Sequence, residues 1–206
     1  MRLKIQKLEP GAQLKQHRII LFVGRRGTGK TRLAEDIMYQ IKDNVDFGLA
    51  MTPTEDTASM FRSHMPDAWV YSAFSCQKIE QMLAIQRQNI AAGKPRDLFL
   101  ICDDCTYDKK VWKSTAIRDL FLNGRHARIT FLMSSQYIMD IGPDLRNNID
   151  YVFCLKQSII AEKRKLHTYF FGMFEKFDDF SRVMDRCTDN YGCIVLDNTA
   201  PTSNLE

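Results

Sequence analysis

The sequence predicts an α/β domain in three layers, with a mostly parallel β-sheet covered by helices on both faces. Short apolar runs rich in β-branched and aromatic side chains recur along the chain, as is typical of strands buried on both faces. Longer segments with apolar residues at helical spacing lie between these runs. An alternation of strands and helices predicts right-handed βαβ units, which build a parallel sheet.

The first half of the chain begins this alternation after a mixed polar start. Thr52-Pro53 stops the second apolar run, because the residue before a proline avoids helical geometry. The segment from there to Pro66 is expected to be a loop. Ile79, Leu83 and Ile90 form an apolar stripe on a long helix. The expected strands are 19–23, 47–51 and 68–71, and the expected helices are 30–42 and 75–92.

The second half continues the same pattern. Asn123-Gly124 ends one helix, and Ser158 is expected to cap another that runs toward Phe171. The expected strands are 98–102, 129–133, 151–155 and 193–196, and the expected helices are 113–122, 158–171 and 174–186. We therefore expect residues 1–206 to form one domain, with a core over about 18–157, C-terminal helices and a closing strand over 158–197, and a tail over 198–206.

Composition places the chain among ordinary globular proteins. It has 206 residues, of which 45% are hydrophobic and 26% charged, and its formal net charge of +4 permits a nucleic-acid partner without demanding one. The apolar runs are far shorter than the roughly 20 residues of a membrane-spanning helix, so none is expected to cross a membrane. Most of the six cysteines fall in apolar stretches, which favours a reducing compartment. Cys102-x-x-Cys105 lacks a second ligand pair, so zinc is not expected.

The segment that follows the first expected strand matches the P-loop motif, with the sequence Gly24-Arg25-Arg26-Gly27-Thr28-Gly29-Lys30-Thr31. In this motif backbone N–H groups wrap a phosphate, the lysine reaches the β- and γ-phosphate oxygens, and the hydroxyl residue binds Mg²⁺. A strand before the motif and a helix after it are the context that the motif requires. We therefore predict a P-loop NTPase fold in which residues 24–32, Arg32 included, bind ATP and Thr31 binds Mg²⁺.

Two adjacent acids follow the expected strand 98–102. A carboxylate at the end of a buried strand next to the P-loop strand is the expected Mg²⁺ partner of Thr31, which assigns this role to Asp103. Asp104 is a candidate to polarise the attacking water, although its side chain is shorter than the glutamate of many P-loop ATPases. The alternative for both residues is a turn or a helix cap.

Polar and basic residues elsewhere complete the list of candidates. Gln136, after the strand 129–133, is a candidate sensor that faces the γ-phosphate between the ends of the other two strands, or simply marks a strand that exits into solvent. An arginine finger from a neighbouring subunit would come from Arg125, Arg128 or Arg146, unless these are ordinary surface residues. Two basic clusters are candidates to follow a DNA backbone, with solvated helix faces as the alternative; they are Lys109, Lys110 and Lys113, and Lys163-Arg164-Lys165.

Taken in order, these motifs resemble the poxvirus-type genome-packaging ATPases of large DNA viruses, which belong to the FtsK–HerA group of P-loop motors. The resemblance covers about residues 18–157 and is strongest over 98–136. The segments that carry it are Gly24 to Thr31, Thr52-Pro53, Leu98 to Asp104, Phe121 to His126, Ser135-Gln136 and Leu145 to Asp150.

The resemblance implies an oligomeric, ring-shaped motor that pulls double-stranded DNA into a capsid at the viral assembly site in the host cytoplasm. It implies a further partner, which is the viral capsid or a membrane-associated capsid protein. It also implies an association of this chain with the virion. It makes Lys30 and Thr31 ligands of phosphate and Mg²⁺, Asp103 a ligand of Mg²⁺, Asp104 the base, Gln136 the sensor and Arg125 the foremost candidate for the finger.

Two other functions share the P-loop. A nucleoside or nucleotide kinase would phosphorylate a small molecule, but the long stretch between Lys30 and Asp103 has room for the extra strand of motor ATPases. A kinase also usually has a mobile arginine-bearing lid, which only Lys163-Arg164-Lys165 imitates weakly. A nucleotide-gated scaffold that binds ATP with little turnover is the third reading, and the absence of an Asn-Lys-x-Asp motif argues against a GTPase.

Overall fold

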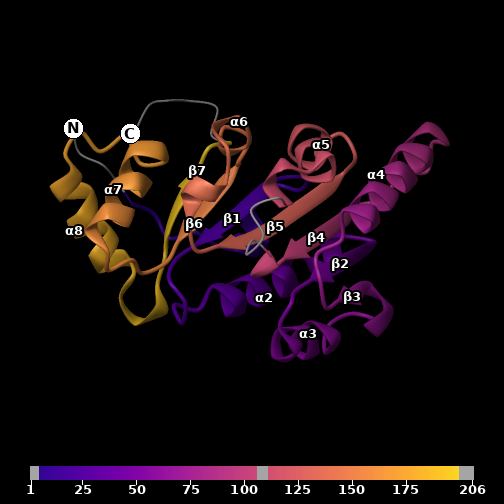
Figure 1. The fold of residues 1–206 in the computed structure, drawn as a ribbon, viewed down its shortest axis with the longest axis horizontal. Coiled ribbons are helices and arrows are strands. Elements are labelled where there is room, and N and C mark those ends of the chain that lie inside the picture. The colour runs from indigo at the N-terminus through magenta and orange to yellow at the C-terminus, as the bar shows by residue number, and fades with distance from the viewer. Residues whose placement is uncertain (1–4, 106–110, 200–206) are drawn as a thin grey trace.

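The computed structural model describes residues 5–105 and 111–199, and within them the chain forms a seven-stranded sheet (Figure 1). The strand order is β3-β2-β4-β5-β1-β6-β7, and every pairing is parallel except that of β6 with β7. The strands are β1 (Ile19–Val23), β2 (Phe47–Met51), β3 (Val70–Tyr71), β4 (Leu98–Cys102), β5 (Ile129–Ser135), β6 (Tyr151–Cys154) and β7 (Ile194–Asp197). The predicted α/β class with a mostly parallel sheet is confirmed.

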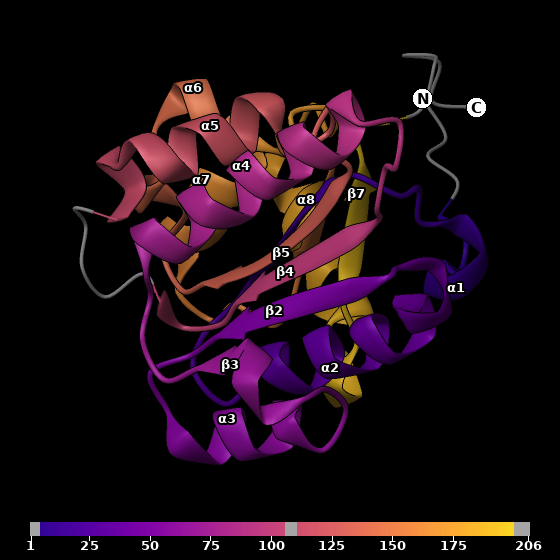
Figure 2. The same ribbon diagram turned by 90° about the vertical axis from the view of Figure 1, so that its right-hand side faces the viewer.

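Helices cover both faces of this sheet, which makes the three layers (Figure 2). One face carries α2 (Lys30–Ile41) and α3 (Glu55–Arg62), and a short helix, α1 (Pro10–Gln13), packs against α2. The other face carries α4 (Cys76–Ala91), α5 (Thr115–Asn123), α6 (Pro143–Arg146), α7 (Ile160–Tyr169) and α8 (Phe177–Cys187).

The central strand β1 shows why the apolar runs are nearly continuous. Ile19, Leu21 and Val23 point into the cluster beneath α4 to α8, whereas Ile20 and Phe22 point into the cluster above α2 and α3. Side chains alternate between the two faces of a strand, and both faces here are buried. Each such aliphatic or aromatic side chain contributes about 1.5–3 kcal/mol of burial free energy, so polar residues are excluded from the run.

Several predicted bounds are confirmed and two predictions are wrong. The strands 19–23, 47–51 and 98–102 are found as predicted. The expected loop before Pro66 instead contains α3, because Ala58 and Phe61 bury one side of it and acidic residues occupy its first turn, where the helix dipole favours them. Ser158 does not cap α7, which begins at Ile160 and has Ile159 at the cap position.

Smaller differences affect the apolar stripe and the elements near the site. In α4, Ile90 is 38% exposed, and buried Gln86 continues the stripe by donating to the backbone carbonyls of Arg96 and Ala127, both at 2.7 Å. The helix expected over 113–122 begins at Thr115, where the Ser114 hydroxyl accepts from the Ile117 N–H. The strand expected over 129–133 extends to Ser135, so two serines lie inside it. The short helix α1 was not predicted.

Candidate functional site

The loop that joins β1 to α2 lies at the edge of the sheet where the parallel strands end. Gly27 and Gly29 have φ angles of +77° and +94°, in the region that only glycine adopts readily. Gly29 is also the residue before α2, and no side chain caps the first turn of that helix. The free N–H groups of this turn, together with the positive end of the helix dipole, are therefore available to an anion.

The beginning of the loop is packed closely against the segment after β6. A Cβ built on Gly24 would lie 2.9 Å from Cβ of Leu155 and 2.9 Å from Oγ1 of Thr28, so a larger residue would displace the loop. Oγ1 of Thr28 donates to the backbone carbonyl of Arg25 at 2.8 Å and closes the turn. These contacts constrain the conformation at the beginning of the loop.

Lys30 spans the loop from inside. Its side chain is buried, and Nζ donates to the carbonyl oxygens of Gly24 at 2.9 Å and Arg25 at 3.0 Å. Burial lowers the pKa of the Lys30 ammonium, an effect that the charges of Asp104 and Asp103 oppose. The ammonium is thus partly desolvated and held by neutral carbonyls, which are weaker partners than phosphate oxygens.

Thr31 and Asp103 meet as predicted. Oγ1 of Thr31 donates to Oδ2 of Asp103 at 2.8 Å, while Oδ1 of Asp103 is buried and has no hydrogen-bond partner among the described residues. Burial raises the pKa of Asp103, although hydrogen bonds from Ser134 and Thr31 oppose that rise. A threonine hydroxyl beside a buried carboxylate with a free oxygen is a donor set that suits Mg²⁺.

The position of Asp103 in the sheet differs from the prediction in one respect. The strand that carries it, β4, was expected next to the P-loop strand, but β5 lies between β4 and β1, which agrees with the expectation that the polar end of the strand 129–133 lies between the ends of the other two. Thr31 on the first turn of α2 reaches across the end of β5 to make the contact. The residues at the end of β5 therefore lie between the two halves of the site.

Asp104, Ser134 and Gln136 form the second part of the site. The backbone N–H of Asp104 donates to Oγ of Ser134 at 2.9 Å, and Nε2 of Gln136 lies 3.5 Å from Oδ1 of Asp104. Asp104 has a φ angle of +50°, a left-handed conformation that aspartate tolerates better than most residues and that turns its carboxylate away from the strand. The structure thus brings together the two residues proposed as base and sensor.

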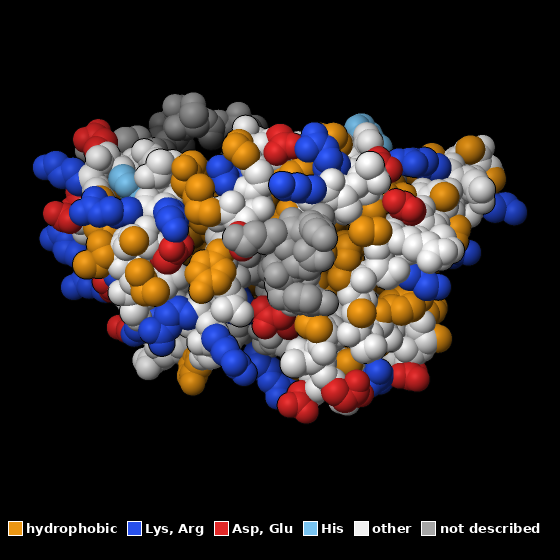
Figure 3. Space-filling model, in the orientation of Figure 1, with side chains coloured by type: hydrophobic (Ala, Val, Ile, Leu, Met, Phe, Trp, Pro, Cys, Tyr) orange, Lys and Arg blue, Asp and Glu red, His pale blue; other side chains and the backbone are white. Residues whose placement is uncertain are grey.

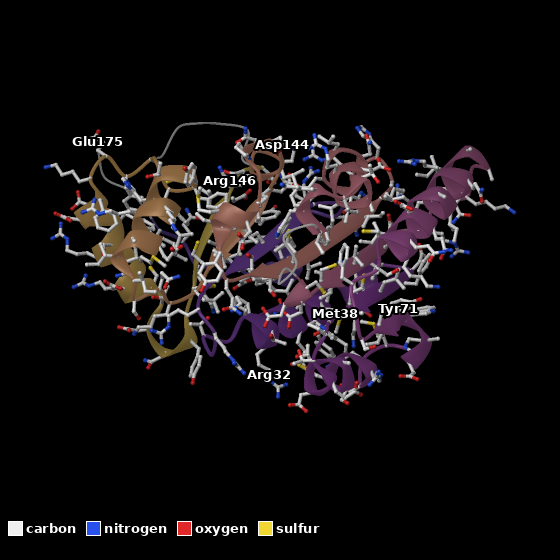
Figure 4. The ribbon with its side chains drawn as sticks, viewed as in Figure 1. Arg32, Met38, Tyr71, Asp144, Arg146 and Glu175 are labelled. Carbon is white, nitrogen blue, oxygen red and sulfur yellow. The ribbon has the colours of Figure 1, made fainter. Side chains whose placement is uncertain are left out.

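The three arginines of the predicted nucleotide site take different directions. NH1 of Arg25 donates to Oγ of Ser158 at 3.1 Å, and Arg26 is exposed on the loop. NH1 of Arg32 pairs with Oε2 of Glu35 at 2.8 Å on the surface of α2, and its side chain is 77% exposed. The structure therefore does not bring the side chain of Arg32 to the loop (Figure 4).

The finger candidates all lie away from the loop of their own chain. Arg125 and Arg128 precede β5 at the opposite edge of the sheet, where the strands begin; NH2 of Arg125 pairs with Oδ1 of Asp150 at 2.7 Å, and Arg128 makes two bonds to Asp97. Arg146 is buried on α6, where NH1 donates to the carbonyl of Ile141 at 2.5 Å. Figure 4 shows Arg146 and Arg32 on opposite sides of the sheet.

The buried role of Arg146 disfavours it as a finger. Its guanidinium also lies 4.4 Å from the ring centroid of Tyr169, so the buried side chain makes its contacts within its own chain. Arg125, by contrast, has a side chain that is 58% exposed and is the more accessible of the two.

The basic clusters and the cysteine pair are also placed by the structure. Lys109 and Lys110 lie outside the described residues. In the other cluster Lys163 is buried and pairs with Asp185 at 2.6 Å, which disfavours it as a DNA contact.

A hydrogen bond with Cys105 and burial raise the pKa of the Cys102 thiol, and this opposes the thiolate form that a metal needs. Among the described helices none is long and apolar enough to span a membrane.

The site also includes residues that the sequence did not single out. Leu155 packs on Gly24, and Tyr191, from the turn between α8 and β7, lies beside Gly29. Ser134 lies inside β5, which extends two residues beyond the predicted strand, and accepts from the backbone N–H of Asp104. No local pattern connects Tyr191 with the loop, because the contact joins distant parts of the chain.

Comparison with known proteins identifies a family and relatives. The family described as Poxvirus A32 protein matches residues 10–166. Protein L437 of Acanthamoeba polyphaga mimivirus is 30% identical over 197 residues, which cover 91% of this chain and 69% of that protein. Protein 088R of Invertebrate iridescent virus 3 is 31% identical over 188 residues, which cover 90% and 70%.

Solved structures show the same fold at low sequence identity. The genome packaging NTPase B204 from Sulfolobus turreted icosahedral virus 2, in complex with ATP-γS, is similar with a TM-score of 0.62 and 17% identity over 90% of this chain and 94% of that one. The cytoplasmic domain of the Thermomonospora curvata Type VII secretion ATPase EccC is similar with a TM-score of 0.58 and 12% identity, covering 90% of this chain and 25% of that one.

Proposed function

This chain belongs to the poxvirus A32 protein family, and from that premise we propose that it is an ATP-driven motor that packages double-stranded viral DNA into a capsid. The observation that carries the proposal is the contact between Thr31 and Asp103, which joins the P-loop to a buried carboxylate with a free oxygen. The likeness of the fold to a viral genome packaging NTPase supports the same function.

The residues of the site would divide the work of hydrolysis. The loop N–H groups would hold the β-phosphate, and the Lys30 ammonium would exchange the carbonyls of Gly24 and Arg25 for phosphate oxygens. Mg²⁺ held by Thr31 and Asp103 would neutralise charge on the β- and γ-phosphates. Water attacks the γ-phosphorus, its proton passes to the carboxylate of Asp104, and the bond to the bridging oxygen breaks to release ADP. Gln136, which contacts Asp104, would sense the γ-phosphate and its loss.

Replacing Asp104 with asparagine should separate binding from hydrolysis. The variant should keep its affinity for ATP but lose about 100-fold or more in turnover, since the amide cannot accept the proton of the attacking water. Steady-state ATPase rates and nucleotide affinity, measured on the same preparation, check this. An equal loss of affinity would mean that Asp104 shares the metal with Asp103.

The proposed partners are double-stranded DNA, further copies of this chain in a ring, and a viral capsid protein or membrane-associated capsid protein. The proposed place of assembly is the host cytoplasm. The ion pairs of Lys163 with Asp185 and of Lys165 with Glu162 disfavour the cluster 163–165 as the main DNA-binding surface. Basic side chains over α7 and α8 are interspersed with acidic ones (Figure 3). The contacts to DNA are therefore expected from several subunits lining a ring rather than from one strongly basic patch.

Double-stranded DNA should raise ATP turnover several-fold. Raising the salt from about 50 to about 200 mM should increase the DNA concentration needed for half-maximal stimulation by about 10-fold or more, because bound lysines and arginines release counterions from the phosphate backbone. A preparation of Lys30→Ala, treated identically, controls for contaminating ATPases.

The same assay distinguishes the kinase alternative. Phosphorylation of a nucleoside without any response to DNA would favour a nucleoside or nucleotide kinase. The structure offers that reading little support, because the segment 163–165, the basic cluster compared with a kinase lid, lies within helix α7, with Arg164 packed 4.2 Å from the ring centroid of Phe177.

A further inference from the structure

The turn between α8 and β7 has an unusual backbone. Asn190 and Tyr191 have φ angles of +50° and +61°, so two adjacent residues with side chains take the left-handed conformation. Asparagine tolerates this conformation, whereas it is uncommon and costly for a bulky aromatic residue. Strain of this kind persists only where surrounding contacts impose it, and it is concentrated at functional sites.

Contacts at both ends impose the shape of this turn. The Gly192 N–H donates to the carbonyl of Asp189 at 2.9 Å, and a Cβ on Gly192 would lie 2.3 Å from the carbonyl oxygen of Cys187. Nζ of Lys156, just after β6, pairs with Oδ1 of Asp189 at 2.8 Å. The turn therefore contacts both the end of α8 and the segment just after β6, the strand that pairs with the P-loop strand β1.

The ring of Tyr191 lies beside Gly29 of the P-loop, and most of the residue is exposed to solvent. A Cβ built on Gly29 would lie 3.4 Å from Cδ1 of Tyr191, yet the residue as a whole is 80% exposed. Core packing does not explain an aromatic ring in this position, because most of its surface faces solvent. A strained, fastened turn thus presents an aromatic surface beside the phosphate-binding loop.

The side of the loop on which Tyr191 lies is informative. Asp103, Asp104 and Gln136 mark the γ-phosphate end of the site, and they follow β4 and β5, on one side of β1. Leu155, Lys156 and Tyr191 lie on the other side of β1, near the end of β6. A nucleotide whose γ-phosphate points toward Asp103 would project its ribose and base toward the side of Tyr191.

We propose that Tyr191 is the platform on which the base of the bound nucleoside triphosphate stacks. This inference rests on the proposed ATP-binding function of the P-loop and adds the residue that recognises the base. An aromatic ring attracts any nucleobase through its π-face, and such stacking contributes measurably to affinity. The contact is made by a segment that follows the matched family region, residues 10–166, so it lies outside the motifs that define the site.

The test compares a nucleotide with a probe that lacks a base. The affinities of AMPPCP, a non-hydrolysable ATP analogue, and of inorganic tripolyphosphate are measured by calorimetry in excess Mg²⁺. Tyr191→Asn removes the ring but suits the left-handed backbone, and Tyr191→Phe keeps the ring. Tyr39→Asn is the matched control, because Tyr39 is also exposed but packs near Lys42 and His64 on the surface of α2.

Tyr191→Asn should bind AMPPCP about 10-fold more weakly and tripolyphosphate as the wild type does, while Tyr191→Phe and Tyr39→Asn leave both affinities unchanged. The inference is overturned if Tyr191→Asn binds AMPPCP as tightly as the wild type, or if Tyr191→Phe weakens it as much as asparagine does. An equal loss for tripolyphosphate also overturns it, since the ring would then only support Gly29. Failure of the wild type to bind AMPPCP would refute the ATP-binding function itself.

Discussion

Replacing Lys30 with alanine should reduce ATP hydrolysis to background, a loss of at least about 100-fold, while leaving the fold intact. Within the described part of the chain the Lys30 ammonium donates to the carbonyls of Gly24 and Arg25 and forms no ion pair, and Lys30 is not part of the apolar core. Its expected partners are the β- and γ-phosphate oxygens, whose negative charge grows in the transition state. Steady-state ATPase rates measure the loss, and thermal unfolding measures the fold.

Lys42→Ala is the matched control for this experiment. Lys42 follows the same helix, is exposed, and places Nζ 3.8 Å from the ring centroid of Tyr39 rather than in the loop. Its removal should leave turnover unchanged. Wild-type turnover in Lys30→Ala would remove the basis for assigning a nucleotide site to residues 24–31.

Arg125→Ala should retain ATP binding but lose about 10³-fold or more in hydrolysis, as expected for an arginine finger. Arg125 lies at the edge of the sheet opposite its own P-loop, so the expected site of its action is that of a neighbouring subunit. The fold should survive the change, because Asp150 keeps the bond from the Ile19 N–H at 2.9 Å and the nearby Arg18 at 3.7 Å. ATPase rates and ATP affinity on the same sample check both parts.

A mixing experiment tests whether Arg125 acts between subunits. Combining Arg125→Ala with Asp104→Ala creates some interfaces in which an intact Asp104 meets an intact Arg125, so partial activity should return although each variant is inactive alone. Arg118→Ala serves as the control, because Arg118 is similarly exposed and makes a comparable surface pair with Asp144. Background activity in mixed oligomers of verified composition would exclude a finger in trans.

Local sequence was sufficient for the central strands and for the P-loop. The runs 19–23, 47–51 and 98–102 are apolar at every position or nearly so, and in a parallel sheet covered on both faces such runs have no other stable location. The glycines and Lys30 lie within eight consecutive residues, so their shape depends on backbone conformations that the residue types themselves select.

Elements with mixed composition were predicted less well. The sequence predicts a loop where α3 lies, because these eight residues include few large apolar side chains; burial of Ala58 and Phe61 and the acidic first turn stabilise the helix. Ile90 was expected in the core, but it is 38% exposed near the end of α4; the buried Gln86 lies on the stripe instead, where its Nε2 donates two hydrogen bonds while its Oε1 has no partner among the described residues.

By itself the sequence determined the fold class, the P-loop and the identity of the acids at the end of β4, because each depends on neighbours in the chain. Only the tertiary structure decided that Asp104 meets Gln136, that Thr31 reaches Asp103 across the end of β5, and that Arg32 turns away while Arg146 is buried. It also placed Tyr191 beside Gly29. These contacts join residues that are distant in sequence, and strand order and helix packing set them, so no local pattern of residue types records them.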